Sequence, residues 1–102
     1  MDIQKEKDLK LYFKRHKYCF VYIYDSWCSS ITLDLETFFK SKYDLNKMFL
    51  KLSVSNSQLI QTLGITVYPI ILVYNKDNVI SEIPCNTQNI ISNVEKVYDF
   101  LN

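Results

Sequence analysis

The chain has 102 residues, 48% of them hydrophobic and 15% aromatic, which is enough to bury the core of one domain over residues 1–102. Twelve Lys and Arg residues against eleven Asp and Glu residues leave a formal charge of +1, so the composition predicts no nucleic-acid and no membrane partner. The apolar runs are too short to span a bilayer and the charged start is not a secretory signal. We therefore expect a cytoplasmic protein, while a targeting segment trimmed from a precursor would leave no trace in this sequence.

The first half of the chain predicts two helices and two strands in alternation. Helical spacing of apolar residues predicts a helix over residues 3–16 and a second one from the region of Cys28 to residue 42. A continuous apolar run over residues 18–24 is typical of a strand covered on both faces, and residues 48–54 are a second strand candidate. The helical spacing is carried by Leu9, Tyr12 and Phe13, and then by Ile31, Leu35, Phe38, Phe39 and Lys42.

A short helix is predicted in the middle of the second half. Ser57 is expected to cap a helix through Leu63, and Gly64 is expected to end it in the left-handed conformation. The chain would then turn into the last pair of strands.

A hairpin and a helix are expected to close the chain. Residues 70–74 and 79–83 are β-prone and flank a polar tetrad at 75–78, which predicts two antiparallel strands. The clearest amphipathic pattern runs over residues 90–101 and predicts a helix entered through Asn86 or Thr87.

The order α-β-α-β-α-β-β-α predicts an α/β fold with a mixed parallel and antiparallel sheet between helices. The first two strands should be parallel neighbours, with the terminal hairpin adding an antiparallel edge. Ligand sites in open sheets of this kind lie beyond the carboxyl ends of strands. Residues 26–30 follow the first strand directly, which makes Cys28 a candidate site residue.

The three cysteines, Cys19, Cys28 and Cys85, are odd in number and lack the spacing of zinc ligands. They predict neither a disulfide scaffold nor a metal site, and no cofactor is expected. The only glycine is Gly64, so there is no glycine-rich phosphate loop. Cys19 lies within the first predicted strand and is expected to be an inert core residue.

Two short motifs lie about forty residues apart in the order expected of one known family. Trp27-Cys28 matches the Trp-Cys that opens the Trp-Cys-Gly-Pro-Cys motif of thioredoxins, and Val67-Tyr68-Pro69-Ile70 matches their cis-proline segment. The chain resembles the thioredoxin family over nearly its whole length. This resemblance implies the thioredoxin fold and thiol-disulfide chemistry at Cys28.

The resemblance also assigns roles around Cys28. Cys28 would be the nucleophile, because the start of a helix favours the thiolate; the alternative is a small buried hydrophobic residue. Trp27 would shield the thiol, and Pro69 would be the cis proline that faces it, with an extended substrate strand alongside. Tyr68 is bulkier than the usual residue at its position and would either narrow this groove or suit it to a different partner. The expected substrate groove consists of Trp27, Ser29, Ser30, Ile31, Tyr68 and Pro69.

Several positions depart from the family pattern. Ile31 stands in place of the resolving cysteine, and Tyr22 stands in place of the buried aspartate that serves it. The two departures are consistent with each other. A buried carboxylate is energetically costly, and without a resolving thiol with which to exchange protons there is little reason to retain it. Ser29 and Ser30 replace Gly-Pro and are expected to cap the helix and to donate hydrogen bonds toward a Cys28 thiolate, or only to cap it.

Cys85 takes the position of a small glycine in the family's groove and is a possible resolving thiol for Cys28. A bridge would require their Cα atoms to lie within about 7 Å. Lys51 resembles the family's buried lysine, although a lysine at a strand end is more often solvated. The acidic residues Asp34, Glu36 and Asp44 are expected on the wet face of the second helix.

A basic run at residues 14–17 includes the only histidine, His16. It is expected to be a solvated helix end whose charges complement the helix dipole. A catalytic pair of His16 and Cys28 is not expected, because the two residues should lie at opposite edges of the sheet.

Three functions are compatible with these residues. The first is a thiol-disulfide protein acting through Cys28 alone, with a protein disulfide or thiol as partner and release by an external thiol such as glutathione, or by Cys85. The second is a non-catalytic adaptor that binds a partner segment in the former groove. The third, a monothiol glutaredoxin, is least supported because the expected Gly-Gly turn is absent.

Overall fold

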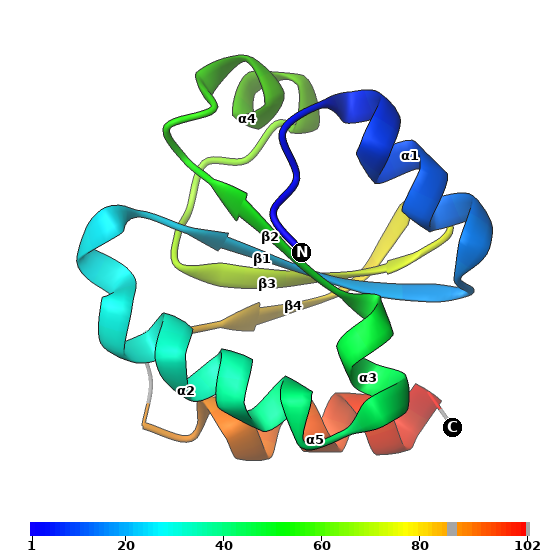
Figure 1. Cartoon of the computed structure of the whole chain (residues 1–102), viewed down its shortest axis with the longest axis vertical. Coiled ribbons are helices and arrows are strands. Elements are labelled where there is room, and N and C mark those ends of the chain that lie inside the picture. The colour runs from blue at the N-terminus through cyan, green and yellow to red at the C-terminus, as the bar shows by residue number, and fades with distance from the viewer. Residues whose placement is uncertain (86–87, 102) are drawn as a thin grey trace.

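The computed structural model describes residues 1–85 and 88–101. Short helices and strands alternate along most of its length (Figure 1). In chain order they are α1 (Glu6–Arg15), β1 (Tyr18–Tyr24), the single 3-10 turn η1 (Ser26–Cys28), α2 (Ser29–Lys40), α3 (Tyr43–Met48), β2 (Phe49–Ser53), α4 (Ser57–Leu63), β3 (Ile70–Asn75), β4 (Asn78–Pro84) and α5 (Ile90–Leu101).

The sheet has four strands in the order β2-β1-β3-β4. Strand β1 pairs with β2 in parallel and with β3 in antiparallel orientation, and β4 pairs antiparallel to β3. Tyr22 lies opposite Lys51 in one pair and opposite Ile71 in the other. The predicted α/β fold with a mixed sheet is confirmed.

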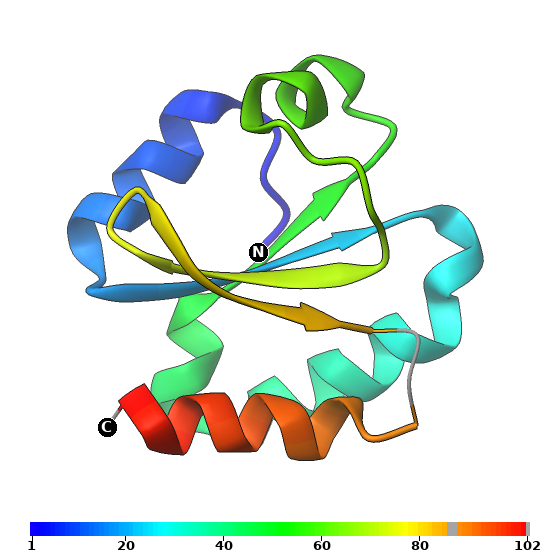
Figure 2. The same cartoon turned by 180° about the vertical axis from the view of Figure 1, so that it is seen from behind.

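Helices cover both faces of the sheet, α1 and α4 on one side and α2, α3 and α5 on the other (Figures 1 and 2). Because successive side chains of a strand point to opposite faces, β1 supplies both cores. Cys19, Val21 and Ile23 pack into the core on the α1 side, whereas Phe20 and Tyr22 pack on the α2 side. The five central residues of β1 are all buried, as a strand covered on both faces requires.

Aromatic rings dominate the core on the α2 side. The rings of Phe39 and Phe49 stack with centroids 4.1 Å apart, and Phe20 meets Phe39 edge-on at 5.8 Å. Tyr22 stacks on Phe49 at 6.3 Å and on Tyr24 at 5.4 Å. These contacts join helix α2 to the end of β1 where the candidate site lies.

The amino-terminal residues correct one prediction. Helix α1 begins at Glu6, not at Ile3, and residues 1–3 run alongside β2 instead. The backbone N–H of Ile3 donates to the carbonyl of Lys51 at 2.8 Å, and Lys51 N–H donates to the carbonyl of Met1 at 2.7 Å. The predicted start of the helix at Ile3 is therefore wrong. Ile3 is buried because it lies beside β2, and not because it belongs to a helix face.

Helix α3 has no counterpart among the predicted elements, and α2 ends at Lys40, two residues before its predicted end. Six residues are too few to show a helical period, so a helix of this length leaves little signal in sequence. Leu45 is its buried contact with the core.

Helix α4 occurs as predicted, but its cap is Asn56 and not Ser57. The Asn56 side chain accepts a hydrogen bond from Leu59 N–H at 3.3 Å. Gly64 ends the helix with φ 68°, the left-handed conformation expected of it. The predicted entry to α5 at Asn86 or Thr87 lies outside the described residues.

Candidate functional site

The candidate site begins where β1 ends. Asp25 follows the strand, and its side chain accepts a hydrogen bond from Ser26 N–H at 2.7 Å. The N–H of Cys28 then donates to the carbonyl of Asp25 at 3.0 Å, which closes the turn η1. This turn delivers Cys28 to the amino-terminal cap of α2.

Exposure differs sharply between neighbouring residues of this turn. Trp27 is 63% exposed, whereas Cys28 is only 1% exposed. Ser29 and Ser30 are exposed and form the first turn of α2. The expected serine cap is wrong, because Cys28 occupies the cap position itself and no side-chain hydrogen bond caps the helix.

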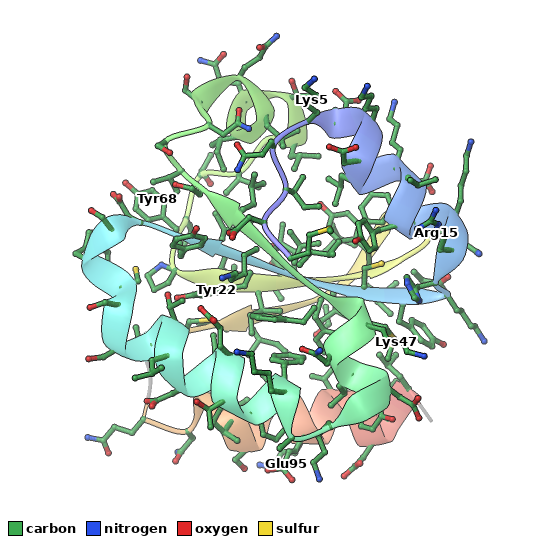
Figure 3. All side chains as sticks on the ribbon, in the orientation of Figure 1. Lys5, Arg15, Tyr22, Lys47, Tyr68 and Glu95 are labelled. Carbon is green, nitrogen blue, oxygen red and sulfur yellow. The ribbon has the colours of Figure 1, made fainter. Side chains whose placement is uncertain are left out.

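The segment before β3 runs past the same end of the sheet. The Tyr68–Pro69 peptide bond is cis. Ile23 of β1 pairs with Ile70, so Pro69 lies at the level where β1 ends. Pro69 is buried, whereas Tyr68 is 44% exposed and lies on the left in Figure 3. With Val67 at 61% exposure, this segment presents apolar surface to solvent.

Cys85 is brought to this end of the sheet by the β3–β4 hairpin. Its N–H donates to the carbonyl of Pro69 at 3.1 Å, and its thiol contacts the carbonyl of Ile83 at 3.5 Å. Cys85 is 1% exposed. Burial, and then negative charge at Cys28, raise the pKa of the Cys85 thiol to about 12. Cys85 therefore strongly favours its protonated form.

Tyr22 fills the space on the α2 side of β1 and is fully buried. Its hydroxyl lies 2.9 Å from the Thr32 hydroxyl, on the second turn of α2. Burial raises the pKa of Tyr22 to about 12 and outweighs the hydrogen bond to Thr32, which lowers it. A neutral hydroxyl pair therefore occupies this position. Ile31 is half-buried and packs against the same core.

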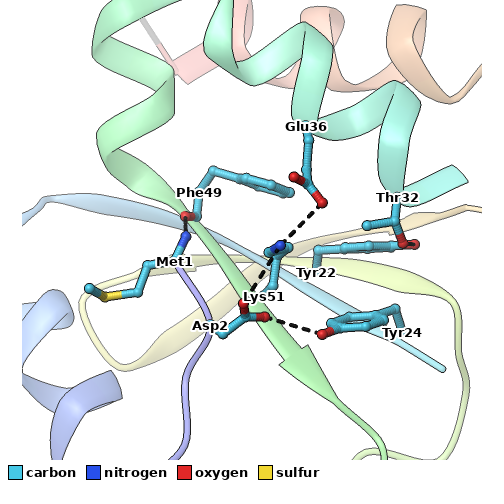
Figure 4. A network of polar contacts seen from close by, with 8 residues as sticks. All are labelled: Met1, Asp2, Tyr22, Tyr24, Thr32, Glu36, Phe49 and Lys51. Atoms are coloured by element: carbon cyan, nitrogen blue, oxygen red, sulfur yellow. Dashed lines mark hydrogen bonds and ion pairs between the residues drawn. The ribbon is translucent and has the colours of Figure 1, made fainter. Parts of the chain in front are cut away.

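Lys51 of β2, which lies opposite Tyr22 of β1, is the centre of a polar network (Figure 4). Its amino group lies 3.1 Å from a Glu36 carboxylate oxygen and 3.7 Å from an Asp2 oxygen. The Tyr24 hydroxyl donates to the other Asp2 oxygen at 3.1 Å. Burial opposes the charge on Lys51, but the hydrogen bond to Glu36 and the charges of Asp2 and Glu36 outweigh it and raise the Lys51 pKa.

This network decides between the two interpretations of Lys51 and corrects the prediction for Glu36. The Lys51 side chain is 17% exposed, which agrees with a largely buried lysine and not with a solvated one. Glu36 is 31% exposed and bonds to Lys51, so it does not belong to the wet face of α2.

Solved structures show which known fold this arrangement matches. The chain is similar to the oxidised thioredoxin of Plasmodium falciparum, with a TM-score of 0.77 and 17% identity over 95% of both chains. A thioredoxin from Schistosoma mansoni gives a TM-score of 0.76 and 15% identity over 100% of this chain and 94% of that one. A thioredoxin from Nicotiana alata gives 0.77 and 16% over 98% and 90%. The chain has the thioredoxin fold.

Sequence comparison alone finds no such relationship, since no protein-family model and no curated protein matches the chain. At sequence identities of 15 to 17%, the similarity to these structures establishes the fold alone. The chemistry has to be argued from the residues themselves. Within residues 1–85 and 88–101, no three His, Cys, Asp or Glu side chains gather where they could hold a metal ion. No helix in this part of the chain is long and apolar enough to cross a membrane.

The thioredoxin fold brings together only some of the residues singled out by sequence. Cys28, Cys85 and Pro69 lie at the same end of the sheet, and the Tyr22 side chain contacts α2 through Thr32. Cys19 lies in the core on the opposite face, where its thiol contacts the Tyr12 carbonyl at 3.7 Å and burial raises its pKa to about 11.

Two α2 residues face this region, Thr32, which sequence reasoning missed, and Glu36, which it assigned to the wet face of the helix. They follow Cys28 at intervals of four, so all three lie along one side of the helix. This spacing is the signal that identifies them. Thr32 supports Tyr22 and Glu36 supports Lys51, and both partners occupy adjacent strands of the sheet.

Proposed function

We propose that this chain is a thioredoxin-like thiol-disulfide protein in which Cys28 is the attacking residue. The observation that carries the proposal is the position of Cys28 at the amino-terminal cap of α2, at the end of the sheet where Pro69 also lies. The positive end of a helix dipole stabilises a thiolate, which is the attacking form. The thiolate would attack one sulfur of a partner disulfide, forming the Cys28–partner bond and releasing the other sulfur as a thiolate.

Release of the partner requires a second thiol. Ile31 cannot supply one, so we propose that an external thiol such as glutathione attacks the Cys28 sulfur or the partner sulfur and breaks the mixed disulfide. Cys85 is the alternative within the chain. Its raised pKa makes it a poor nucleophile near neutral pH, so we favour the external thiol.

The partner would bind as an extended segment across the apolar surface beside Cys28. Trp27 and Tyr68 are exposed large side chains at this end of the sheet, and Pro69 lies next to them along the chain. The exposed Ser29 and Ser30 would border the segment, with the half-buried Ile31 behind them. The preferred partner is therefore a protein disulfide or thiol flanked by apolar residues.

A cytoplasmic location would suit this chemistry. Cys19, Cys28 and Cys85 are all free thiols, and reducing compartments keep thiols in that state.

An adaptor without chemistry is the second candidate function, and the burial of Cys28 favours it. A thiol with 1% residue exposure is not open to a bulky disulfide without movement of its neighbours. The exposed Trp27, Val67 and Tyr68 would then bind a partner segment by apolar contact alone.

A trapping experiment tests the proposal. Reduced protein is mixed with a protein disulfide substrate, quenched in acid and analysed by mass spectrometry of its peptides. We expect an adduct on Cys28 in the wild-type protein and in Cys19→Ala, and no adduct in Cys28→Ser. Failure of Cys28 to form any adduct, while the unfolded chain reacts fully, would contradict the redox function.

Binding measurements separate the adaptor from the enzyme. If the adaptor function is correct, Cys28→Ser binds the same partner peptide with unchanged affinity, whereas Trp27→Ala weakens it. A partner captured only through a bond to Cys28 supports the redox function instead.

A further inference from the structure

Basic side chains from four separate segments gather at the end of the molecule opposite Cys28. Strand β1 separates the two ends by its seven residues, which is roughly 20 Å. In Figure 3, Arg15 and Lys47 lie on the right, whereas Tyr68 lies on the left. We call this end the basic pole and define it by Lys10, Lys14, Arg15, Lys17, Lys47 and Lys76.

Two surface depressions flank the last turn of α1 at the basic pole. One has a volume of about 580 Å³ and contains Lys10, Lys14 and Lys76 together with Phe13 and Asp77. The other has a volume of about 490 Å³, and its lining includes Arg15 and Lys47. The backbone of the hairpin turn is fixed to the start of β1, because Lys76 N–H donates to the Lys17 carbonyl at 3.1 Å.

The helix dipole accounts for only part of this cluster. Lys14 and Arg15 lie in the last turn of α1, where cations complement the helix dipole. Lys76 comes from the β3–β4 turn and Lys47 from the end of α3, so neither is explained by that helix. Half of the chain's twelve Lys and Arg residues thus converge on one end, although the chain as a whole carries only +1.

Most of these cations are not neutralised by neighbours. Within residues 1–85 and 88–101, Lys14, Arg15, Lys17 and Lys76 form no ion pair. Lys10 is paired with Glu6 at 3.0 Å, on the solvent side of α1. Among the residues that line the two depressions at the basic pole, Asp77 is the acid. Lys14, Arg15 and Lys76 are therefore available to an anionic partner.

The first depression is also apolar. Its base is formed by Phe13, which is 7% exposed and packs on the Tyr74 ring at 4.7 Å, and its walls include the hydrocarbon stems of lysines. A surface that combines cations with a hydrocarbon base matches a ligand that combines carboxylates with an apolar side chain.

We propose that the basic pole is a docking surface for an acidic peptide segment of a partner protein, with one apolar residue of that segment seated against Phe13. A polynucleotide fits less well, because the cations of the first depression surround the apolar Phe13, whereas a phosphate backbone is bound by a broad basic surface. A lipid surface fits less well because the apolar contact lies in a depression and does not protrude. This surface lies far from Cys28, so the inference does not depend on the redox function.

Fluorescence anisotropy with two labelled peptides tests the inference. The first is acetyl-Glu-Glu-Leu-Phe-Glu-Glu-amide, and the second has Gln in place of each Glu. We expect the acidic peptide to bind, the Gln peptide to bind at least about tenfold more weakly, and binding to fall as salt shortens the screening length from about 30 Å to about 10 Å.

Charge-reversal variants locate the site. Lys14→Glu combined with Lys76→Glu should weaken acidic-peptide binding at least about tenfold, since two attractive contacts become repulsive. The matched control, Lys5→Glu combined with Lys96→Glu, changes the net charge equally on exposed residues of other surfaces and should retain binding within about twofold. The combination of Lys14→Gln with Lys76→Gln should weaken acidic-peptide binding by an intermediate amount. It replaces the charge-reversal variant if that variant does not fold.

Three results would overturn the inference. The first is that the acidic peptide does not bind, and the second is that the Lys14/Lys76 variant and the Lys5/Lys96 variant lose equal affinity for it. The third is that a single-stranded RNA or phosphatidylserine vesicles bind more tightly than the peptide. Adduct formation at Cys28 should be the same in all of these variants, so failure of the docking surface and failure of the redox function are distinguishable.

Discussion

The hydroxyl groups of Tyr22 and Thr32 lie 2.9 Å apart and join β1 to α2 directly behind the turn that carries Cys28. In the thioredoxin pattern that the sequence resembles, a buried carboxylate serving a resolving thiol is expected at the position of Tyr22. In this chain Ile31 carries no thiol, and a neutral hydroxyl pair fills the space beside β1. The substitution keeps the space filled and the polar atoms satisfied without a buried charge.

Removing this hydroxyl pair should destabilise the fold modestly. Tyr22→Phe keeps the stacked ring but loses the hydrogen bond, so we expect the free energy of unfolding to fall by about 1 kcal/mol. Tyr22→Asp should cost several times more, because it loses the buried ring and introduces a buried carboxylate. Urea denaturation measures both.

Thr32→Val supplies the matched control. If the two hydroxyls bond only to each other, the double variant of Tyr22→Phe and Thr32→Val should cost about as much as either single variant. Additive costs would show that the 2.9 Å contact carries no coupling energy.

The sequence predicts those elements of the fold whose apolar residues follow a local pattern. Residues 18–24 are continuously apolar and form the central strand, and the spacing over residues 90–101 forms α5. Helix α3 was missed because its six residues are too few to show a period. Ile3 was placed in a helix because its pairing with β2 depends on residues almost fifty positions away, as in the bond from Ile3 N–H to the Lys51 carbonyl.

The site was predicted unevenly for the same reason. Cys28 and Pro69 belong to short motifs and were identified directly. The ion pairs of Lys51 could not be predicted, because Asp2 and Glu36 are far from it in sequence and no local pattern connects them. The sequence left the burial of Cys28 open, as one of two interpretations, since burial depends on how neighbouring segments pack and not on the motif itself.

Lys51 should matter more to stability than an exposed lysine in an ion pair. Lys51→Met leaves the partly buried Glu36 carboxylate without its partner, and we expect a loss of about 1 to 2 kcal/mol. The control is Lys10→Met, which breaks the exposed Lys10–Glu6 pair and should cost no more than about 0.5 kcal/mol.

A second background tests the cause of that loss. In Glu36→Gln protein the carboxylate charge is absent, so Lys51→Met should cost less than it does in the wild-type protein. Equal costs in both backgrounds would assign the effect to packing of the lysine stem, not to the ion pair.

Alkaline pH should destabilise the folded chain. Burial raises the pKa of Cys85 from 9.0 to about 12, that of Cys19 from 9.0 to about 11, and that of Tyr22 from 10.0 to about 12. The unfolded chain loses these protons at lower pH than the folded chain does. Their contribution is therefore fully present below pH 9 and is lost as the pH rises toward 12.

The slope of this loss is the measurable quantity. Each group should lower the free energy of unfolding by about 1.4 kcal/mol per pH unit while only its unfolded form titrates. Urea denaturation under reducing conditions should show a shallower decline for Cys85→Ala than for the wild-type chain between pH 9 and 10. Parallel curves for the two proteins would show that Cys85 is not protected from ionisation by the fold.

Release of a Cys28 mixed disulfide should depend on an outside thiol and not on Cys85. The pKa of Cys85, about 12, leaves almost no thiolate near neutral pH, whereas glutathione is present in excess in solution. Starting from the isolated Cys28 adduct, we expect the release rate to rise in proportion to the glutathione concentration. Cys85→Ala should leave this rate unchanged within about twofold, because the variant removes a thiol that does not react. Release without added thiol, abolished by Cys85→Ala and accompanied by a Cys28–Cys85 disulfide in peptide maps, would instead identify Cys85 as the resolving residue.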